Sequence, residues 1–133
     1  MSGVIDIRAA LETRLNALSP ALQTEWENTR IIPTADIPYQ SVNILFADPA
    51  NYENSASYQE LGYMQVDLRY PINQAAGPAG RRAQLLRDWF PRGLTLTSNG
   101  VTACISKTPS VGNGRFEADR YIISVKIPFF SNH

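Results

Sequence analysis

The chain has 133 residues, of which 44% are apolar and 18% charged, so it suits one globular domain with its own core and is too short for a multidomain enzyme. Twelve basic and twelve acidic side chains give a formal net charge of zero, which disfavours non-specific binding to nucleic acid or to an anionic membrane. The single cysteine, Cys104, and the single histidine, His133, exclude an intramolecular disulfide framework and a His/Cys zinc site.

The first predicted element is a helix over residues 4–18. Its apolar residues recur at steps of three and four, which is the spacing that lines one face of a helix. They are Val4, Ile7, Leu11, Leu15 and Leu18. Ser2 is suited to cap the start of this helix, and Pro20 ends it because the residue before a proline avoids helical dihedrals. The polar face holds Asp6, Arg8, Glu12 and Asn16.

Three strands are predicted next. Residues 21–38 follow Pro20, contain Pro33 and Pro38 and have few apolar positions, which indicates a short, irregular edge strand. Apolar and polar residues alternate over residues 42–46 and again over residues 64–70, the two-residue period of a strand. The connection over residues 47–60 carries acidic side chains and no base, and its length is typical of a functional or mobile segment.

A second helix is predicted over residues 81–90, after the breaker Gly77-Pro78-Ala79-Gly80. Its apolar side is predicted to hold Leu85, Leu86, Trp89 and Phe90. Its outward side is predicted to hold Arg81, Gln84, Arg87 and Asp88.

The dipeptide Asn99-Gly100 predicts a tight hairpin, because both residues tolerate the positive φ values of a type I′ turn. A two-residue turn places Leu96 opposite Ala103 and Thr95 opposite Cys104. The apolar face of the hairpin is then Leu94, Leu96, Val101, Ala103 and Ile105. After a Gly/Asn-rich loop over residues 108–115, alternation over residues 121–129 predicts the last strand.

This element order predicts an α+β fold, in a single domain over residues 1–133. We expect a mostly antiparallel, mixed β-sheet of about five to six strands covered on one face by two α-helices. No apolar run approaches the ~18 residues of a spanning helix, and the N-terminal residues lack the pattern of a signal peptide. We therefore expect a cytoplasmic protein.

The charges separate along the chain although they cancel overall. Residues 1–60 carry eight acidic and three basic side chains, whereas residues 61–133 carry four acidic and nine basic ones. The fold either interleaves the two halves and mixes the charges over the surface, or it creates an acidic side and a basic side.

No residue pattern predicts catalysis. Cys104 lies in a predicted strand with no histidine to activate it. The pairs Glu25/Glu27 and Glu117/Asp119 could be drawn as acid–base couples, but charges at strand edges that discourage unwanted pairing explain them as well. We therefore predict that the protein is not an enzyme and has no catalytic, metal-binding or cofactor-binding residues.

Seven short segments follow one another along nearly the whole chain. They are Leu15-Asn16-Ala17-Leu18-Ser19-Pro20, Trp26-Glu27-Asn28, Pro38-Tyr39, Phe90-Pro91-Arg92-Gly93-Leu94, Thr108-Pro109-Ser110-Val111-Gly112, Asp119-Arg120-Tyr121 and Ile127-Pro128-Phe129-Phe130. In their order and spacing they resemble the tail-terminator (tail completion) proteins of tailed bacteriophages. None of the segments is a catalytic signature.

The resemblance implies a structural protein of the virion tail, with no cofactor. Such proteins form a ring, commonly a hexamer, that caps the tail tube at its head-proximal end, stops its polymerisation and offers a surface for joining the head. The implied partners are further copies of this chain, the tail tube protein and a head–tail connector protein. Binding to a membrane or to a specific nucleic-acid sequence is not implied. Assembly would take place in the host cytoplasm.

A ring packs two different patches of each copy together, which suits a molecule with one acidic and one basic side. The predicted subunit interface pairs basic residues of one copy with acidic residues of the next. Its members are Arg81, Arg82, Arg87 and Arg92 on one side and Asp48 and Glu53 on the other. The loops over residues 47–60 and 108–115 are expected to be mobile in the free protein and to order against the tail tube or the head partner. The candidate contacts are Tyr52, Asn54, Tyr58, Asn113 and Arg115.

Two alternatives stay open. A head–tail connector or stopper component shares the size and the ring symmetry. A monomeric small-ligand module would instead use an aromatic patch of Trp26, Tyr52, Tyr58 and Tyr63, although core or interface packing also accounts for those residues.

Overall fold

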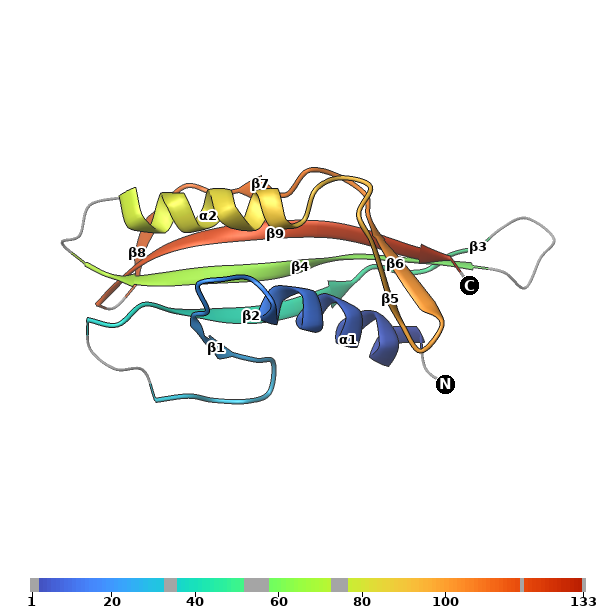
Figure 1. Ribbon diagram of the computed structural model, residues 1–133, viewed down its shortest axis with the longest axis horizontal. Helices are drawn as coiled ribbons and strands as arrows, with labels where there is room; N and C mark the ends of the chain where they lie inside the picture. The colour runs from blue at the N-terminus through green and yellow to red at the C-terminus, as the bar shows by residue number, and fades with distance from the viewer. Residues whose placement is uncertain (1–2, 33–35, 52–57, 73–76, 118, 133) are drawn as a thin grey trace.

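The computed structural model describes residues 3–32, 36–51, 58–72, 77–117 and 119–132 (Figure 1). The elements in chain order are α1 (Gly3–Asn16), β1 (Gln23–Glu25), β2 (Tyr39–Phe46), β3 (Ala50–Asn51), β4 (Tyr58–Pro71), α2 (Gly77–Trp89), β5 (Thr95–Ser98), β6 (Val101–Ile105), β7 (Ser110–Val111), β8 (Arg115–Glu117) and β9 (Arg120–Asn132).

Two long strands, β4 and β9, form the centre of a curled sheet with nine strands in the described part of the chain. The main path runs β1-β2-β4-β9-β6-β5, β3 adds to β4, and β7 and β8 add to β9. Among these pairs β1–β2 is parallel and the others are antiparallel. The predicted α+β fold with a mixed, mostly antiparallel sheet is confirmed, and three short strands supplement its main path.

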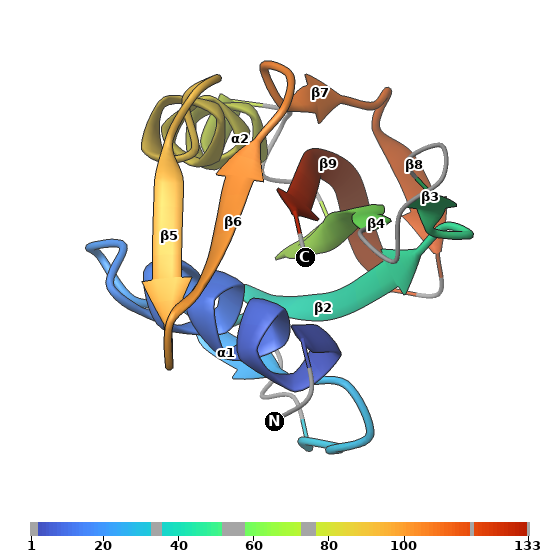
Figure 2. The same ribbon diagram turned by 90° about the vertical axis from the view of Figure 1, so that its right-hand side faces the viewer.

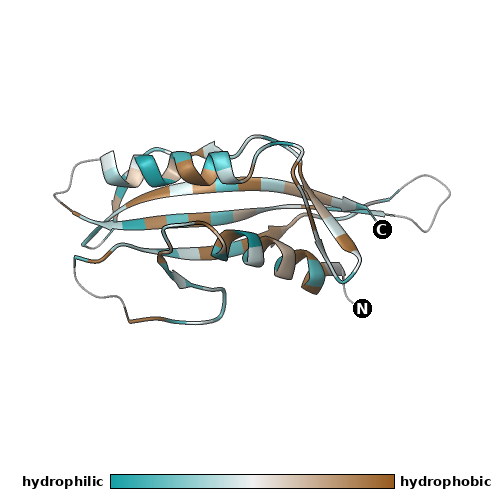
Figure 3. Ribbon diagram, viewed as in Figure 1, coloured by the Kyte–Doolittle hydropathy of each residue, from teal (hydrophilic) through white to brown (hydrophobic). Residues whose placement is uncertain are grey.

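Both helices pack on one face of the sheet. Alternate residues of β2, β4 and β9, such as Val42, Val66 and Val125, join buried residues of α1 and α2 in one hydrophobic core. Figure 2 shows the two helices on the same side of these strands, and Figure 3 shows the apolar and polar bands that alternate along β9. The opposite face of β4 carries Gln65, Asp67 and Arg69.

Helix α1 buries the stripe that its spacing predicts, with two exceptions. Ile7, Leu11, Leu15 and Leu18 are buried, but Val4 is 38% exposed. Asp6 was expected on the polar face and is instead buried, where its Oδ1 accepts a hydrogen bond from Asn99 Nδ2 at 3.0 Å. This contact fastens the start of the helix to the turn of the β5–β6 hairpin.

Helix α2 is longer than predicted and is rotated about its axis. It begins at Gly77 and buries Ala79, Arg82, Ala83 and Leu86, whereas Leu85 is 41% exposed. The expected apolar side is therefore wrong at Leu85. The small side chains of the first turns allow the helix to lie close to the sheet, and this sets which residues face inward.

The β5–β6 hairpin has the predicted register. Thr95 lies opposite Cys104 and Leu96 lies opposite Ala103. Asn99 and Gly100 have φ values of 50° and 80°, as a type I′ turn requires. This local signal is sufficient to specify the pairing.

The two predicted loops contain regular structure. In the 47–60 segment, β3 pairs with the first residues of β4, and residues 52–57 lie outside the described residues. In the 108–115 segment, β7 pairs with β9, and the Gly112 N–H donates to the Ser124 carbonyl at 2.8 Å. Both segments therefore extend the sheet where loops were expected.

We predict that Gly62→Ala destabilises the fold. Gly62 lies opposite Phe46, whose ring packs edge-on against Phe129 with centroids 5.6 Å apart. An added Cβ would collide with the Leu45 carbonyl oxygen and press on the Phe129 ring. The free energy of unfolding, measured with urea, should fall by roughly 1–3 kcal/mol, the usual cost of overpacking.

The matched control is Gly80→Ala in helix α2, where an added Cβ meets nothing within 4 Å. Alanine favours a helix over glycine by about 1 kcal/mol, so this variant should be as stable as the wild type or more stable. Equal stability of the wild type and the Gly62 variant would contradict the close approach at Gly62.

Candidate functional site

Three of the four acidic side chains considered for catalysis, Glu25, Glu27 and Glu117, have structural partners, and Asp119 is exposed. Glu25 Oε2 accepts the Ile31 N–H at 3.2 Å. Glu27 Oε1 accepts the Ile44 N–H at 2.7 Å, and its Oε2 lies 3.0 Å from Arg8 Nη2. Glu27 therefore holds the segment after β1 against β2 and α1, whereas Glu25 links β1 to a later residue of that segment. No group of three or more His, Cys, Asp or Glu side chains within the described residues could hold a metal ion.

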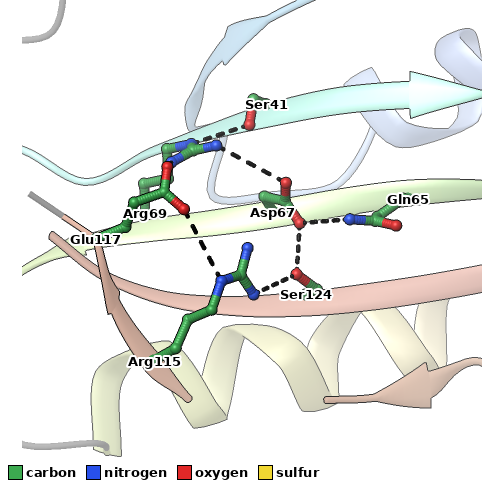
Figure 4. Close-up of polar contacts among 7 residues, drawn as sticks. All are labelled: Ser41, Gln65, Asp67, Arg69, Arg115, Glu117 and Ser124. Atoms are coloured by element: carbon green, nitrogen blue, oxygen red, sulfur yellow. Dashed lines mark hydrogen bonds and ion pairs between the residues drawn. The ribbon is translucent and has the colours of Figure 1, made fainter. Parts of the chain in front are cut away.

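A polar cluster lies on the sheet face opposite the core (Figure 4). Its members are Ser41, Gln65, Asp67, Arg69, Arg115, Glu117 and Ser124. Asp67 is central and only 6% exposed. Its Oδ1 accepts hydrogen bonds from Ser124 Oγ at 2.5 Å and Gln65 Nε2 at 3.0 Å, and its Oδ2 lies 3.8 Å from Arg69 Nη2. These partners offset the cost of burying the charge.

Two arginines extend the polar cluster to the neighbouring strands. Arg69 Nε donates to Ser41 Oγ on β2 at 3.0 Å, and its Nη1 lies 3.4 Å from Glu117 Oε1 on β8. Arg115 Nη1 donates to Ser124 Oγ at 2.9 Å, and its Nε lies 3.9 Å from Glu117 Oε2. The polar cluster therefore links β2, β4, β8 and β9. Alternation in β4 predicted only that this face is wet or paired.

Four cations on α2 and beside the β5–β6 hairpin make no ion pair within the described residues, and we call them the basic surface. They are Arg81, Arg87, Arg92 and Lys107. The acidic Asp88 of α2 is also exposed, and its Oδ1 accepts a hydrogen bond from Gln84 Nε2 at 2.9 Å. Arg81, Arg92 and Lys107 are exposed, and Arg87 Nε donates to the Pro109 carbonyl at 3.0 Å. Asp48 is exposed in the segment between β2 and β3. Figure 2 shows α2 and β3 on opposite sides of the molecule, so the basic surface and this acidic segment lie apart.

Arg82 was predicted to lie in an exposed basic interface, but the structure places it in the interior. It is 4% exposed, and its Nη1 donates to the Pro20 carbonyl. Its buried Nε has no hydrogen-bond partner in the described structure. Burial lowers the pKa of Arg82, and the nearby Tyr70 opposes that shift. Arg82 faces inward because it shares the buried side of α2 with Ala79 and Ala83.

The remaining predicted contact residues fall in three places. Tyr52, Glu53 and Asn54 lie outside the described residues. Tyr58 begins β4 and is half-buried, and Asn113 is exposed between β7 and β8. Arg115 is held in the polar cluster by Ser124 and Glu117.

Of the aromatic residues named for the small-ligand alternative, Tyr52 lies outside the described residues and Tyr58 begins β4. Trp26 packs against the core and lines a cavity of about 300 Å³ with Glu25, Arg30, Asn43 and Arg69, among others. Tyr63 lies on the outer face of β4, with Lys126 Nζ 5.2 Å from its ring centroid.

Comparisons with known proteins agree with this architecture. A family model described as phage tail terminator protein matches residues 6–129. Six solved chains match, and one has a TM-score of 0.77 and 25% identity over 100% of this chain and 96% of its own. No curated protein matches the sequence. No helix in the described ranges is long and apolar enough to cross a membrane.

We predict that Asp67→Ala lowers the free energy of unfolding by about 1–3 kcal/mol, because the half-buried donors of Ser124 and Gln65 lose their acceptor. Asp48→Ala serves as the control, since Asp48 is exposed and should change stability by less than about 0.5 kcal/mol. Urea unfolding measures both. Equal effects of the two substitutions would show that the polar cluster does not stabilise the sheet.

Proposed function

Because this chain belongs to the phage tail terminator family, we propose that it forms a ring that caps the tail tube, ends tube polymerisation and offers the surface for joining the head. Its role in phage tail assembly and its place in the virion tail follow from the family. To this role the proposal adds a ring of six copies. It also adds two partners on the axis of the ring, the tail tube protein and a head–tail connector protein. The role is structural and uses no cofactor.

The observation that carries the ring is the separation of unpaired charge. The basic surface on α2 and at the base of the β5–β6 hairpin lies away from the acidic segment at Asp48. A cyclic ring joins two different patches of each copy, and opposite charges on those patches guide docking and fix its orientation. The sequence of the same segment contains a second acidic residue, Glu53.

The axial contacts are proposed to lie in the 47–60 and 108–115 segments. Asn113 is exposed there, and Arg115 is held in a fixed position by the polar cluster. A contact surface that is already ordered loses less conformational entropy when it binds. Tyr52, Asn54 and Tyr58 complete the proposed set.

The first experiment measures the mass of the purified protein by light scattering over a range of concentrations and at two salt concentrations. We expect a mass of about six chains that falls in high salt, because salt screens exposed charges over distances of about 10 Å. Tube protein polymerising in the presence of this chain should stop at shorter lengths than tube protein alone. Unchanged tube lengths would refute the terminator role.

We predict that Arg81→Glu combined with Arg92→Glu weakens assembly at least about tenfold, because like charges then face each other across the interface. Both side chains are exposed, so the melting temperature should stay near that of the wild type. Concentration-dependent light scattering and circular dichroism measure the two quantities. Assembly as strong as the wild type would exclude these arginines from the interface.

Arg82→Glu is the matched comparison on the buried side of the same helix. The new carboxylate would lie in the interior without a cationic partner, so the variant should lose stability even as a monomer. A fully stable Arg82→Glu monomer would contradict the inward position of this residue.

A further inference from the structure

Strand β5 leaves one edge of the sheet open. It ends the main strand path, so its second edge pairs with no strand of the described chain. In an antiparallel ladder, alternate residues direct their N–H and C=O groups toward the partner strand. The Ile105 N–H donates to the Leu94 carbonyl at 2.8 Å, so Leu94, Leu96 and Ser98 face β6. The backbone groups of Thr95 and Thr97 therefore point outward.

Strand β5 lacks two of the features that usually prevent strands of different molecules from pairing, namely charge and proline. Edge strands are commonly protected by charges, prolines, bulges or very short length. The four residues of β5, Thr95-Leu96-Thr97-Ser98, include neither a charge nor a proline. By contrast, β1 at the other end of the path has three residues and includes Glu25.

A groove of about 420 Å³ runs beside the open edge. Three small side chains and one arginine of α1 and the turn after it line the groove together with residues 96–98 of β5, and these are Ala10, Thr13, Ala17 and Arg14. Partners that add a strand to a sheet edge combine backbone hydrogen bonds with pockets that receive alternate side chains. The open edge and the groove together have the form of such an acceptor.

The charges near the edge indicate the occupant. Arg92 and Lys107, at the base of the hairpin, make no ion pair within the described residues. The 47–60 segment, which contains β3, carries Asp48, Glu53 and Glu60 and no base. Strand β3 pairs with β4 on one side only, and Figure 2 shows β3 and β5 on opposite sides of the molecule.

We propose that β5 of one copy pairs with β3 of the next copy, so that the sheets of neighbouring subunits join across the interface. The inference rests on the ring proposed above and names the contact that closes it. Because the two edges differ and lie on opposite sides, each copy can bind the next one head to tail. Such a chain of copies closes into a ring when the rotation between neighbours divides a full turn evenly. Backbone hydrogen bonds at this contact are less sensitive to salt than the surrounding charge pairs.

The test compares Thr97→Pro with Thr97→Ala. Proline removes the outward N–H of residue 97 without removing a hydrogen bond between β5 and β6, and edge strands tolerate it at such positions. Alanine removes the same hydroxyl contact to Thr102 but keeps the N–H. We expect Thr97→Pro to assemble at least about tenfold more weakly than Thr97→Ala, measured by light scattering with and without tube subunits.

Amide hydrogen exchange of the wild type gives an answer that does not depend on the folding of a variant. The amides of Thr95 and Thr97 should exchange at least about tenfold more slowly in the assembled protein than in the dilute monomer. The amide of Leu96 faces β6 and is the internal control, with little change. Unchanged exchange at Thr95 and Thr97 in the assembled protein would overturn the strand pairing.

The outcomes separate this inference from the terminator role. Equal assembly of both variants, with tubes still shortened, overturns the strand pairing and leaves the role intact. If only Thr97→Pro loses assembly, the strand pairing is supported. If the wild type also leaves tube lengths unchanged, the terminator role is overturned although the pairing stands. A wild type that stays monomeric with and without tube subunits overturns both.

Discussion

The pairing of β4 with β9 is the constraint on which the other features depend. It runs in one register from Gln59 opposite Asn132 to Pro71 opposite Arg120. A shift by one residue would exchange the core side chains for the polar ones on both strands. The core contacts on one face and the Asp67–Ser124 hydrogen bond on the other select the same register. The outer edge of β9 then receives β8, β7 and β6, and these positions determine where β5 lies.

The parts of the fold that the sequence predicts well are those specified by neighbouring residues. The Asn99-Gly100 turn determines the register of β5 and β6 because both strands adjoin it. The stripe of α1 follows from spacing alone, whereas the burial of Asp6 depends on Asn99, 93 positions away. Strands β3 and β7 have two residues each, too few to show a period, and so the segments containing them resembled loops.

The positive charge of the candidate site was predictable from the sequence. The position of Arg82 and the contacts of the polar cluster were not. The surplus of bases in the second half of the chain is visible in the composition, and Arg81 and Arg92 are exposed as expected. Arg82 differs because the rotation of α2 depends on how its small residues meet the sheet. The polar cluster was not predicted as a unit, since Arg69 and Glu117 are 48 positions apart and meet only when β8 pairs with β9.

The separation in sequence of the two central strands also affects how the protein is made. After Asp67 leaves the ribosome, 57 more positions must follow before Ser124 can meet it. Folding dominated by such distant contacts is slow, because loop closure precedes the stabilising contacts. During that interval β4 lacks its longest neighbour, while the β5–β6 hairpin can already form. Newly synthesised chains therefore pass through a stage in which strand edges are open, and such edges favour association between chains.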